Sequence, residues 1–235
     1  MITATDSTTK ATFHLDSDSD EVQEFIDSVM PSRDLPARDL AIALHDAVRD
    51  RIRYEVYDAD LSRKGTTASA ILRRGQGFCV HKSIVYAAAC RAVGIPTRLV
   101  YGDVRNHLAS KRLLELMGGD IFTFHALASV QIDDTWIRAT PVFNTLLCRL
   151  YGIRPLEFDG VHDSYYHPFD ALGRRHMEFV QWRGEFDDFP YETVVGGIAA
   201  NHPKLVGEGL LTAHGSLIDD ARRESQDASG AGLEK

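Results

Sequence analysis

The sequence predicts an α+β protein, in which helices pack against a separate antiparallel sheet. Three observations lead to this fold class. An alanine-rich apolar run over residues 79–93 is too long for an ordinary strand, and it stops at Gly94 and Pro96 as a helix does. Two runs that suit strands, 124–132 and 136–143, flank a short acidic turn and predict a β-hairpin. The chain shows no internal repeat and no proline-rich linker, so one domain is the simplest organisation.

The N-terminal elements are predicted to be helical. Serine and aspartate residues at 16–21 can cap a helix, and apolar residues at helical spacing follow over 22–29. Pro31 stops this run. A second helix starts near Pro36, and a short capped helix is expected over 65–72.

The pattern changes after the alanine-rich helix. Residues 97–104 suit a strand, and 107–119 suit a short helix closed by two glycines. Beyond residue 150 the chain is rich in loop residues. A modest helix signal covers 174–184, and a last helix is expected near 191–199.

The composition is that of an ordinary soluble globular protein, with 44% hydrophobic and 26% charged residues. The chain carries 34 acidic and 26 basic side chains, a formal charge of −8. This balance opposes binding to nucleic acid or to an anionic membrane surface, since both require a basic face. No apolar stretch approaches the roughly 20 residues that cross a bilayer.

The N-terminus and the cysteines indicate the cytoplasm. The first residues are polar and acidic, unlike a secretory signal or a transit peptide. Cys79, Cys90 and Cys148 are an odd number without a CxxC pair, which favours free thiols in a reducing compartment over a disulfide framework.

The motif GQGFCVHKS, residues 75–83, places a thiol at the start of the predicted central helix. Unpaired N–H groups at a helix start favour the thiolate, which is the reactive form. Gly75 and Gly77 remove side-chain bulk ahead of Cys79, which would let a substrate carbonyl approach. His125, on the polar side of its predicted strand, is a candidate base.

Two other interpretations of Cys79 stay open at this point. A cysteine on an alanine-rich helix is most often a packing residue, and Cys90 and Cys148 belong to that class. A zinc site with His81 is the second, but residues two apart on a helix point in different directions. No further Cys or His pair at metal spacing completes a site, so we expect neither a metal nor a cofactor.

Five stretches of the chain resemble the transglutaminase-like superfamily. Residues 77–102 resemble its cysteine-bearing segment, in which a glycine-flanked cysteine opens a helix that ends in Gly-Ile-Pro before a strand. Residues 124–144 resemble its histidine hairpin, with a His, a turn, a Trp and then a Pro. The phrases at 103–108, 158–164 and 173–180 resemble a bacterial branch of transglutaminase-like domain proteins.

This resemblance implies a papain-like core, in which a cysteine-bearing central helix packs on an antiparallel sheet that carries the histidine. It also implies one transglutaminase-like domain over residues 1–218. The core would cover about 36–145 and a C-terminal extension 146–218. Residues 219–235 are expected to be a mobile polar tail.

The resemblance further implies a cysteine-dependent acyl-transfer enzyme. Cys79 would attack an amide or ester carbonyl of a peptide, protein or small molecule, and His125 would move the proton. The acyl group would pass to water, as in a peptidase or amidase hydrolase, or to an amine, as in an acyltransferase. Calcium-dependent cross-linking is the least expected outcome because no acidic loop has calcium-ligand spacing. The alternative is a degenerate module that binds a peptide or partner protein.

One position departs from the family pattern, because Thr140 stands where the resemblance places the aspartate of the triad. The candidates for this third role are Thr140, Asn144 and Asp103, and we expect a neutral group, Thr140 or Asn144, to orient His125. We also expect the thiol pKa to lie below the free value of about 8.5.

Overall fold

The computed structural model describes residues 6–30, 32–107, 109–165, 173 and 177–230. The α-helices of these residues are α1 (Asp20–Val29), α2 (Ala37–Arg51), α3 (Ala68–Arg74), α4 (Cys79–Ala92), α5 (Lys111–Met117), α6 (Thr145–Tyr151), α7 (Tyr191–Asn201) and α8 (Leu217–Gly230). The strands are β1 (Arg53–Tyr54), β2 (Gln76–Gly77), β3 (Thr97–Asn106), β4 (Ile121–Ile132), β5 (Thr135–Ala139) and β6 (Met177–Phe186). Asp6–Thr8 and Glu208–Leu210 form short 3₁₀ turns.

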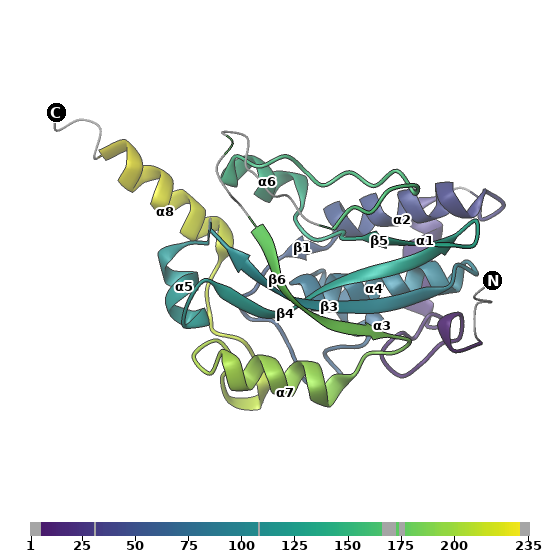
Figure 1. Cartoon of the computed structure of the whole chain (residues 1–235), viewed down its shortest axis with the longest axis horizontal. Coiled ribbons are helices and arrows are strands. Elements are labelled where there is room, and N and C mark those ends of the chain that lie inside the picture. The colour runs from purple at the N-terminus through teal and green to yellow at the C-terminus, as the bar shows by residue number, and fades with distance from the viewer. Residues whose placement is uncertain (1–5, 31, 108, 166–172, 174–176, 231–235) are drawn as a thin grey trace.

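Four strands form one antiparallel sheet in the order β5-β4-β3-β6 (Figure 1). The predicted hairpin is confirmed as β4 and β5, whose ends pair at Ile132 and Thr135. Asp133 and Asp134 between them have φ of 48° and 62°, the left-handed values of a tight hairpin turn. β1 and β2 form a separate two-stranded parallel sheet.

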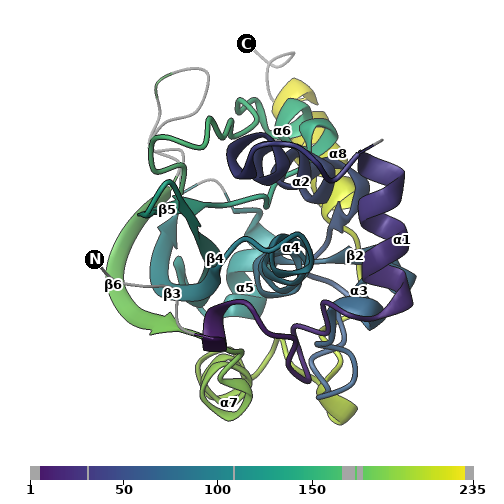
Figure 2. The same cartoon turned by 90° about the vertical axis from the view of Figure 1, so that its right-hand side faces the viewer.

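Helix α4 runs through the centre of the molecule and confirms the predicted α+β fold. Figure 2 looks along α4, with the main sheet to its left, α1 and α3 to its right and α2 above it. Its residues from Cys79 to Arg91 are all buried, although the segment carries polar residues. The alanines of this helix let β4 and the neighbouring helices approach closely.

The helix predicted over 174–184 is wrong, because residues 177–186 form strand β6. β6 pairs antiparallel with β3 from Asn106–Met177 to Leu99–Phe186. The open edge of β3 supplies backbone partners that the local pattern of 174–184 does not encode. Residues 174–176 lie outside the described part of the chain.

The C-terminal segment also differs from the expectation. Part of the stretch expected as a mobile tail, residues 219–230, continues helix α8. Asp220 in its first turn is buried and accepts a hydrogen bond from the Tyr57 hydroxyl. Ala221 is buried as well. This buried contact fixes the start of a segment whose composition alone suggested a solvated coil.

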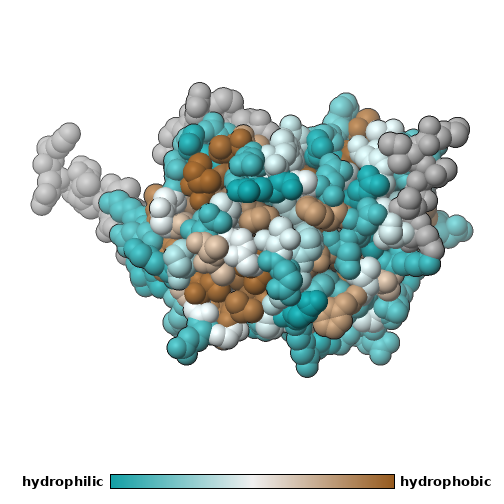
Figure 3. Space-filling view, turned by 60° about the horizontal axis from the view of Figure 1, so that its bottom comes forward, coloured by the Kyte–Doolittle hydropathy of each residue, from teal (hydrophilic) through white to brown (hydrophobic). Residues whose placement is uncertain are grey.

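The surface is predominantly hydrophilic on the face seen in Figure 3, where apolar side chains gather only in small groups. Within the described residues, no helix combines the length and the apolar character that a membrane span requires.

Candidate active site

The start of α4 is held by the short β1–β2 sheet. Tyr54 pairs with Gly77, two residues before Cys79. The Glu55 N–H donates to the Gly77 carbonyl at 3.1 Å, which continues this pairing. Cys79 is the first residue of α4 and is 7% exposed. The sequence-predicted position of the thiol at a helix start is therefore confirmed.

The two glycines before Cys79 have roles other than clearing a substrate path. Gly75 ends α3 in the left-handed conformation, with φ of 67°, which glycine adopts without strain. A Cβ on Gly77 would lie 2.5 Å from the Cβ of His81, so glycine is required there by the packing of the first turn of α4.

His81 forms a hydrogen bond with the backbone of Asp60. Its Nε2 lies 2.9 Å from the Asp60 carbonyl oxygen, and burial lowers its pKa to about 4. The ring is therefore neutral and donates this hydrogen bond. Among the described residues, no group of three His, Cys, Asp or Glu side chains gathers as around a metal ion.

Lys82 ties α4 to the end of α2. Its ammonium group is fully buried and donates to the carbonyls of Arg49 at 2.7 Å and Ile52 at 2.6 Å. These carbonyls belong to the last turn of α2, where a cation interacts favourably with the helix dipole. Burial lowers the pKa of Lys82. The contact fixes the first turn of α4, which carries Cys79, against the chain that leads into β1.

The backbone N–H groups of Cys79, Val80 and Ala126 act on the Cys79 thiol, and each favours the thiolate. Burial acts in the opposite direction and is the larger effect, so the pKa of the Cys79 thiol rises to about 11. The lowered thiol pKa expected from the sequence is therefore wrong, because desolvation outweighs the helix terminus.

His125 stands on β4 beside a backbone irregularity. Strand register shifts between Gly102 and Val104 of β3, opposite this part of β4. Phe124 has φ of 56°, which is strained for an aromatic residue. A Cβ on Gly197 of α7 would lie only 2.1 Å from the Phe124 ring. The position of this ring therefore requires a residue without a side chain at 197. The bulge sets the direction in which the next residue, His125, leaves the strand.

Asp103 holds this bulge rather than the histidine ring. Its Oδ1 accepts from the Phe124 N–H at 3.2 Å and from Arg183 Nε at 3.0 Å. Its Oδ2 accepts from Arg183 Nη2 at 2.7 Å. The Arg183 guanidinium also lies over the Phe124 ring, 5.3 Å from its centroid. Asp103 therefore fixes the residue that precedes His125.

The His125 ring is buried and neutral. Burial lowers its pKa to about 4, and its Nε2 has no hydrogen-bond partner among the described residues. The ring contacts the Phe179 ring edge-on, with 5.9 Å between centroids. A neutral imidazole and a protonated thiol are thus the resting states of the two candidate residues.

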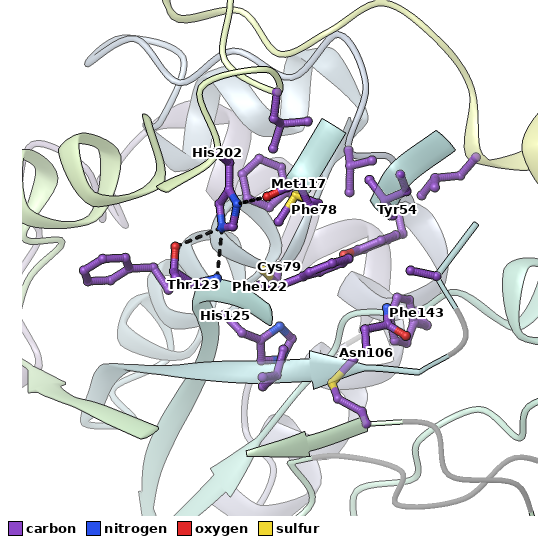
Figure 4. Close-up of a pocket in the computed structure, with 18 of the residues that line it drawn as sticks. Tyr54, Phe78, Cys79, Asn106, Met117, Phe122, Thr123, His125, Phe143 and His202 are labelled. Carbon is purple, nitrogen blue, oxygen red and sulfur yellow. Dashed lines mark hydrogen bonds between the residues drawn. The ribbon is translucent and has the colours of Figure 1, made fainter. Parts of the chain in front are cut away.

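Cys79 and His125 line the same pocket, shown in Figure 4. The backbone of Ala126, the residue after His125, also lowers the pKa of the Cys79 thiol. The structure therefore brings together the two residues that the sequence singled out, although they are 46 positions apart in the chain. The pocket encloses about 890 Å³ of space free of atoms, its open mouth included.

The other candidates for the third role have different partners. Thr140 Oγ1 donates to the Tyr165 carbonyl at 3.2 Å. Asn144 Oδ1 accepts from the Tyr54 N–H at 3.0 Å, and its amide donates to Ile52. In the described residues, neither side chain bonds the His125 ring. Asp159, a further carboxylate near the motif in sequence, is exposed and accepts from His162.

Two pocket residues were not singled out from the sequence. His202 accepts from the Thr123 N–H at 3.0 Å and donates to the Met117 carbonyl at 2.8 Å, so it positions β4 two residues before His125. Tyr54 lines the pocket through its position opposite Gly77. Helix α3 and a loop separate Tyr54 from the cysteine motif at residues 75–83, and His202 lies in the C-terminal part of the chain. No local sequence pattern therefore identifies either residue as part of the pocket.

Residues 25–141 match the family model of the transglutaminase-like superfamily. The chain belongs to the transglutaminase-like superfamily. This match includes α4 with Cys79 and β4 with His125, in the order that the superfamily requires. It ends before α6, so the helices of the C-terminal part that line the pocket lie outside the matched segment. No curated protein matches the chain.

Two solved structures resemble this transglutaminase-like chain. One is a proposed cysteine protease from Cytophaga hutchinsonii, with a TM-score of 0.43 and 19% identity over 57% of this chain and 40% of that one. The other is a proposed protease from Parabacteroides distasonis, with a TM-score of 0.35 and 13% identity over 51% of this chain and 23% of that one. The chain thus spans less than half the length of either protein.

Proposed function

We propose that the protein is a cysteine-dependent acyl-transfer enzyme that acts on an amide or ester bond. The observation that carries this proposal is the placement of Cys79 and His125 on one pocket, with Cys79 as the first residue of α4. Superfamily membership supports the same assignment. The substrate would be a peptide, a protein or a small amide or ester, and the three free cysteines fit a reducing compartment such as the cytoplasm.

Cys79 and His125 are both neutral before the reaction, and this determines the order in which the proton moves and the bonds form. The Cys79 sulfur attacks the carbonyl carbon while His125 takes the thiol proton, so the negative charge moves to the carbonyl oxygen as the carbon–sulfur bond forms. His125 then donates this proton to the leaving group, and a thioester on Cys79 remains. Backbone N–H groups at the start of α4 stabilise negative charge at this place.

The thioester then passes its acyl group to water or to an amine. His125 would take a proton from either acceptor in the second half of the reaction. Adding a primary amine to the assay separates these two outcomes, because an acyltransferase yields the amide and a hydrolase yields the acid.

Asp103 takes the third role in this proposal as a positioning residue, because its carboxylate holds the backbone next to His125. The comparison of Thr140→Val, Asn144→Ala and Asp103→Asn tests this. We expect Asp103→Asn to change the pH profile of acylation the most. A larger change for Thr140→Val or Asn144→Ala would give the role to a neutral group instead.

A binding module without catalysis is the second candidate function, and one observation favours it. Burial moves the pKa of Cys79 up to about 11 and that of His125 down to about 4, which disfavours transfer of the thiol proton to the ring. In this case the pocket would bind a peptide or a partner protein without reacting.

Trapping of the acyl-enzyme distinguishes the two functions. The protein is mixed with p-nitrophenyl esters, and its intact mass and peptides are measured after acid quenching. We expect one acyl group on Cys79, no acyl group on the Cys79→Ser variant and full acylation of the Cys148→Ser variant. Cys148 is a matched control because it is also a buried free thiol. Equal acylation of wild type and Cys79→Ser would overturn the proposal.

A further inference from the structure

The pocket beside Cys79 has predominantly apolar walls. They come from β1, β3, β4, α5, α6 and α7 and from the segment around α8. Representative side chains are Leu113 and Met117 of α5, Leu147 of α6, and Leu205 and Leu217 of the C-terminal segment. In the part of the chain that the structure describes, no Asp, Glu, Lys or Arg lines this pocket.

The histidine on the wall formed by α7 and β4 uses both of its ring nitrogens. His202 donates to Met117, and its other ring nitrogen accepts from the Thr123 N–H. The Thr123 hydroxyl also lies 2.9 Å from this ring nitrogen. Burial lowers the pKa of His202, so the ring is neutral. A charged group that entered this wall would lose its hydration without gaining an opposite charge.

The reactive sulfur lies at the edge of these apolar walls. A thioester on Cys79 therefore places its acyl substituent in a space where burial of each methylene is favourable. The net charge of −8 adds a general repulsion of anionic substrates.

We propose that the acyl group accepted by Cys79 is uncharged and apolar, an aliphatic or aromatic chain seated between α5, α6 and the C-terminal segment. This inference rests on the proposed acyl-transfer function and specifies its substrate class. The walls from α6, α7 and α8 lie beyond the superfamily match, whereas those from β1, β3, β4 and α5 lie within it.

A series of p-nitrophenyl esters tests the inference. The acyl group is lengthened from acetyl to octanoyl. For each ester, the rate constant for acylation of the protein is measured, and the background rate constant of the Cys79→Ser variant is subtracted from it. We expect the rate to rise roughly 3-fold with each added methylene until the pocket is full. A second comparison uses p-nitrophenyl butyrate and p-nitrophenyl hemisuccinate, which differ by a terminal carboxylate. We expect the hemisuccinate to react at least about 10-fold more slowly.

The pocket itself is tested by changing one small residue of its wall. Ala109→Leu adds bulk inside the pocket, so we expect the octanoyl-to-acetyl rate ratio to fall by roughly 10-fold. Ala200→Leu makes the same change on the exposed side of α7 and should leave this ratio unchanged. Leu113→Ala, which enlarges the pocket, should shift the preferred chain to a longer one and provides a second readout if Ala109→Leu does not fold.

The results separate the two proposals. Acylation of Cys79 at equal rates for acetyl, octanoyl and hemisuccinyl esters would overturn the apolar substrate class and leave the acyl-transfer function intact. Absence of acylation on Cys79 with every ester would overturn the acyl-transfer function, and this inference with it.

Discussion

Cys79 is expected to react slowly at neutral pH, because burial keeps its thiol protonated. With a pKa of about 11, its thiolate fraction at pH 7 is roughly 300-fold below that of a free cysteine of pKa about 8.5. We expect the rate of iodoacetamide labelling at Cys79, followed by mass spectrometry, to keep rising up to pH 10. A cysteine peptide is the control and should level off earlier. A plateau for Cys79 between pH 7 and 8 would instead show an ionised cysteine–histidine pair.

Tyr54 is a candidate to stabilise the oxyanion of the reaction. Its ring lines the pocket, and no hydrogen bond of the described residues uses its hydroxyl. Burial raises the pKa of Tyr54, and the charge of a Cys79 thiolate raises it further. We expect Tyr54→Phe to slow ester acylation by about 10²-fold, because one donor to the oxyanion is lost. Alkylation of Cys79 by iodoacetamide should stay the same, since that reaction forms no oxyanion. Tyr151→Phe, on the same pocket, is the control; equal losses in both variants would argue against this role.

At the scale of elements, the β3–β4 bulge depends on the buried carboxylate of Asp103. Asp103→Ala leaves the Phe124 N–H without its acceptor and Arg183 without its partner. We expect the free energy of unfolding to fall by about 2–3 kcal/mol, measured by urea denaturation. Asp27→Ala removes an exposed ion pair with Arg33 and should cost less than about 1 kcal/mol. Similar losses in the two variants would mean that Asp103 has no special part in holding the bulge.

At the scale of the whole molecule, buried histidines make the fold sensitive to acid. Burial lowers the pKa of five of them: His14, His45, His81, His125 and His202. Above pH 6.5 these rings are neutral in the folded and the unfolded chain. Below it the unfolded chain binds protons that the folded chain does not yet bind, in the case of His81 and His125 until about pH 4. The free energy of unfolding therefore decreases as pH falls from 6.5 to 4.

Urea unfolding between pH 7.5 and 4.5 measures this loss. We expect the midpoint to decrease steadily below pH 6.5, with each fully buried histidine contributing up to about 1 kcal/mol per pH unit. His81→Gln should reduce the slope, and His162→Gln should not, because His162 is exposed. A midpoint that stays constant down to pH 5 would contradict the burial of these rings.

The local sequence predicted the elements that carry their own start and stop signals. Helix α4 is bounded by Cys79 and by Gly94 and Pro96, and the β4–β5 hairpin is bounded by its acidic turn. The resemblance to the transglutaminase-like superfamily added the order of Cys79 and His125, which lie on one pocket. These features depend on residues that are close together in the chain.

Tertiary structure alone decided the features that depend on distant segments. β6 is a strand because the edge of β3 pairs with it, and the start of α8 is fixed because Tyr57 bonds Asp220. The thiol pKa rises because elements from across the chain exclude water from Cys79, an effect that overrides the helix terminus visible in the sequence. The sequence by itself thus determined which residues are candidates for the site, because motif and order are local properties of the chain. Burial across the fold determined their charge state and the apolar walls they face, because both depend on segments that are distant in sequence.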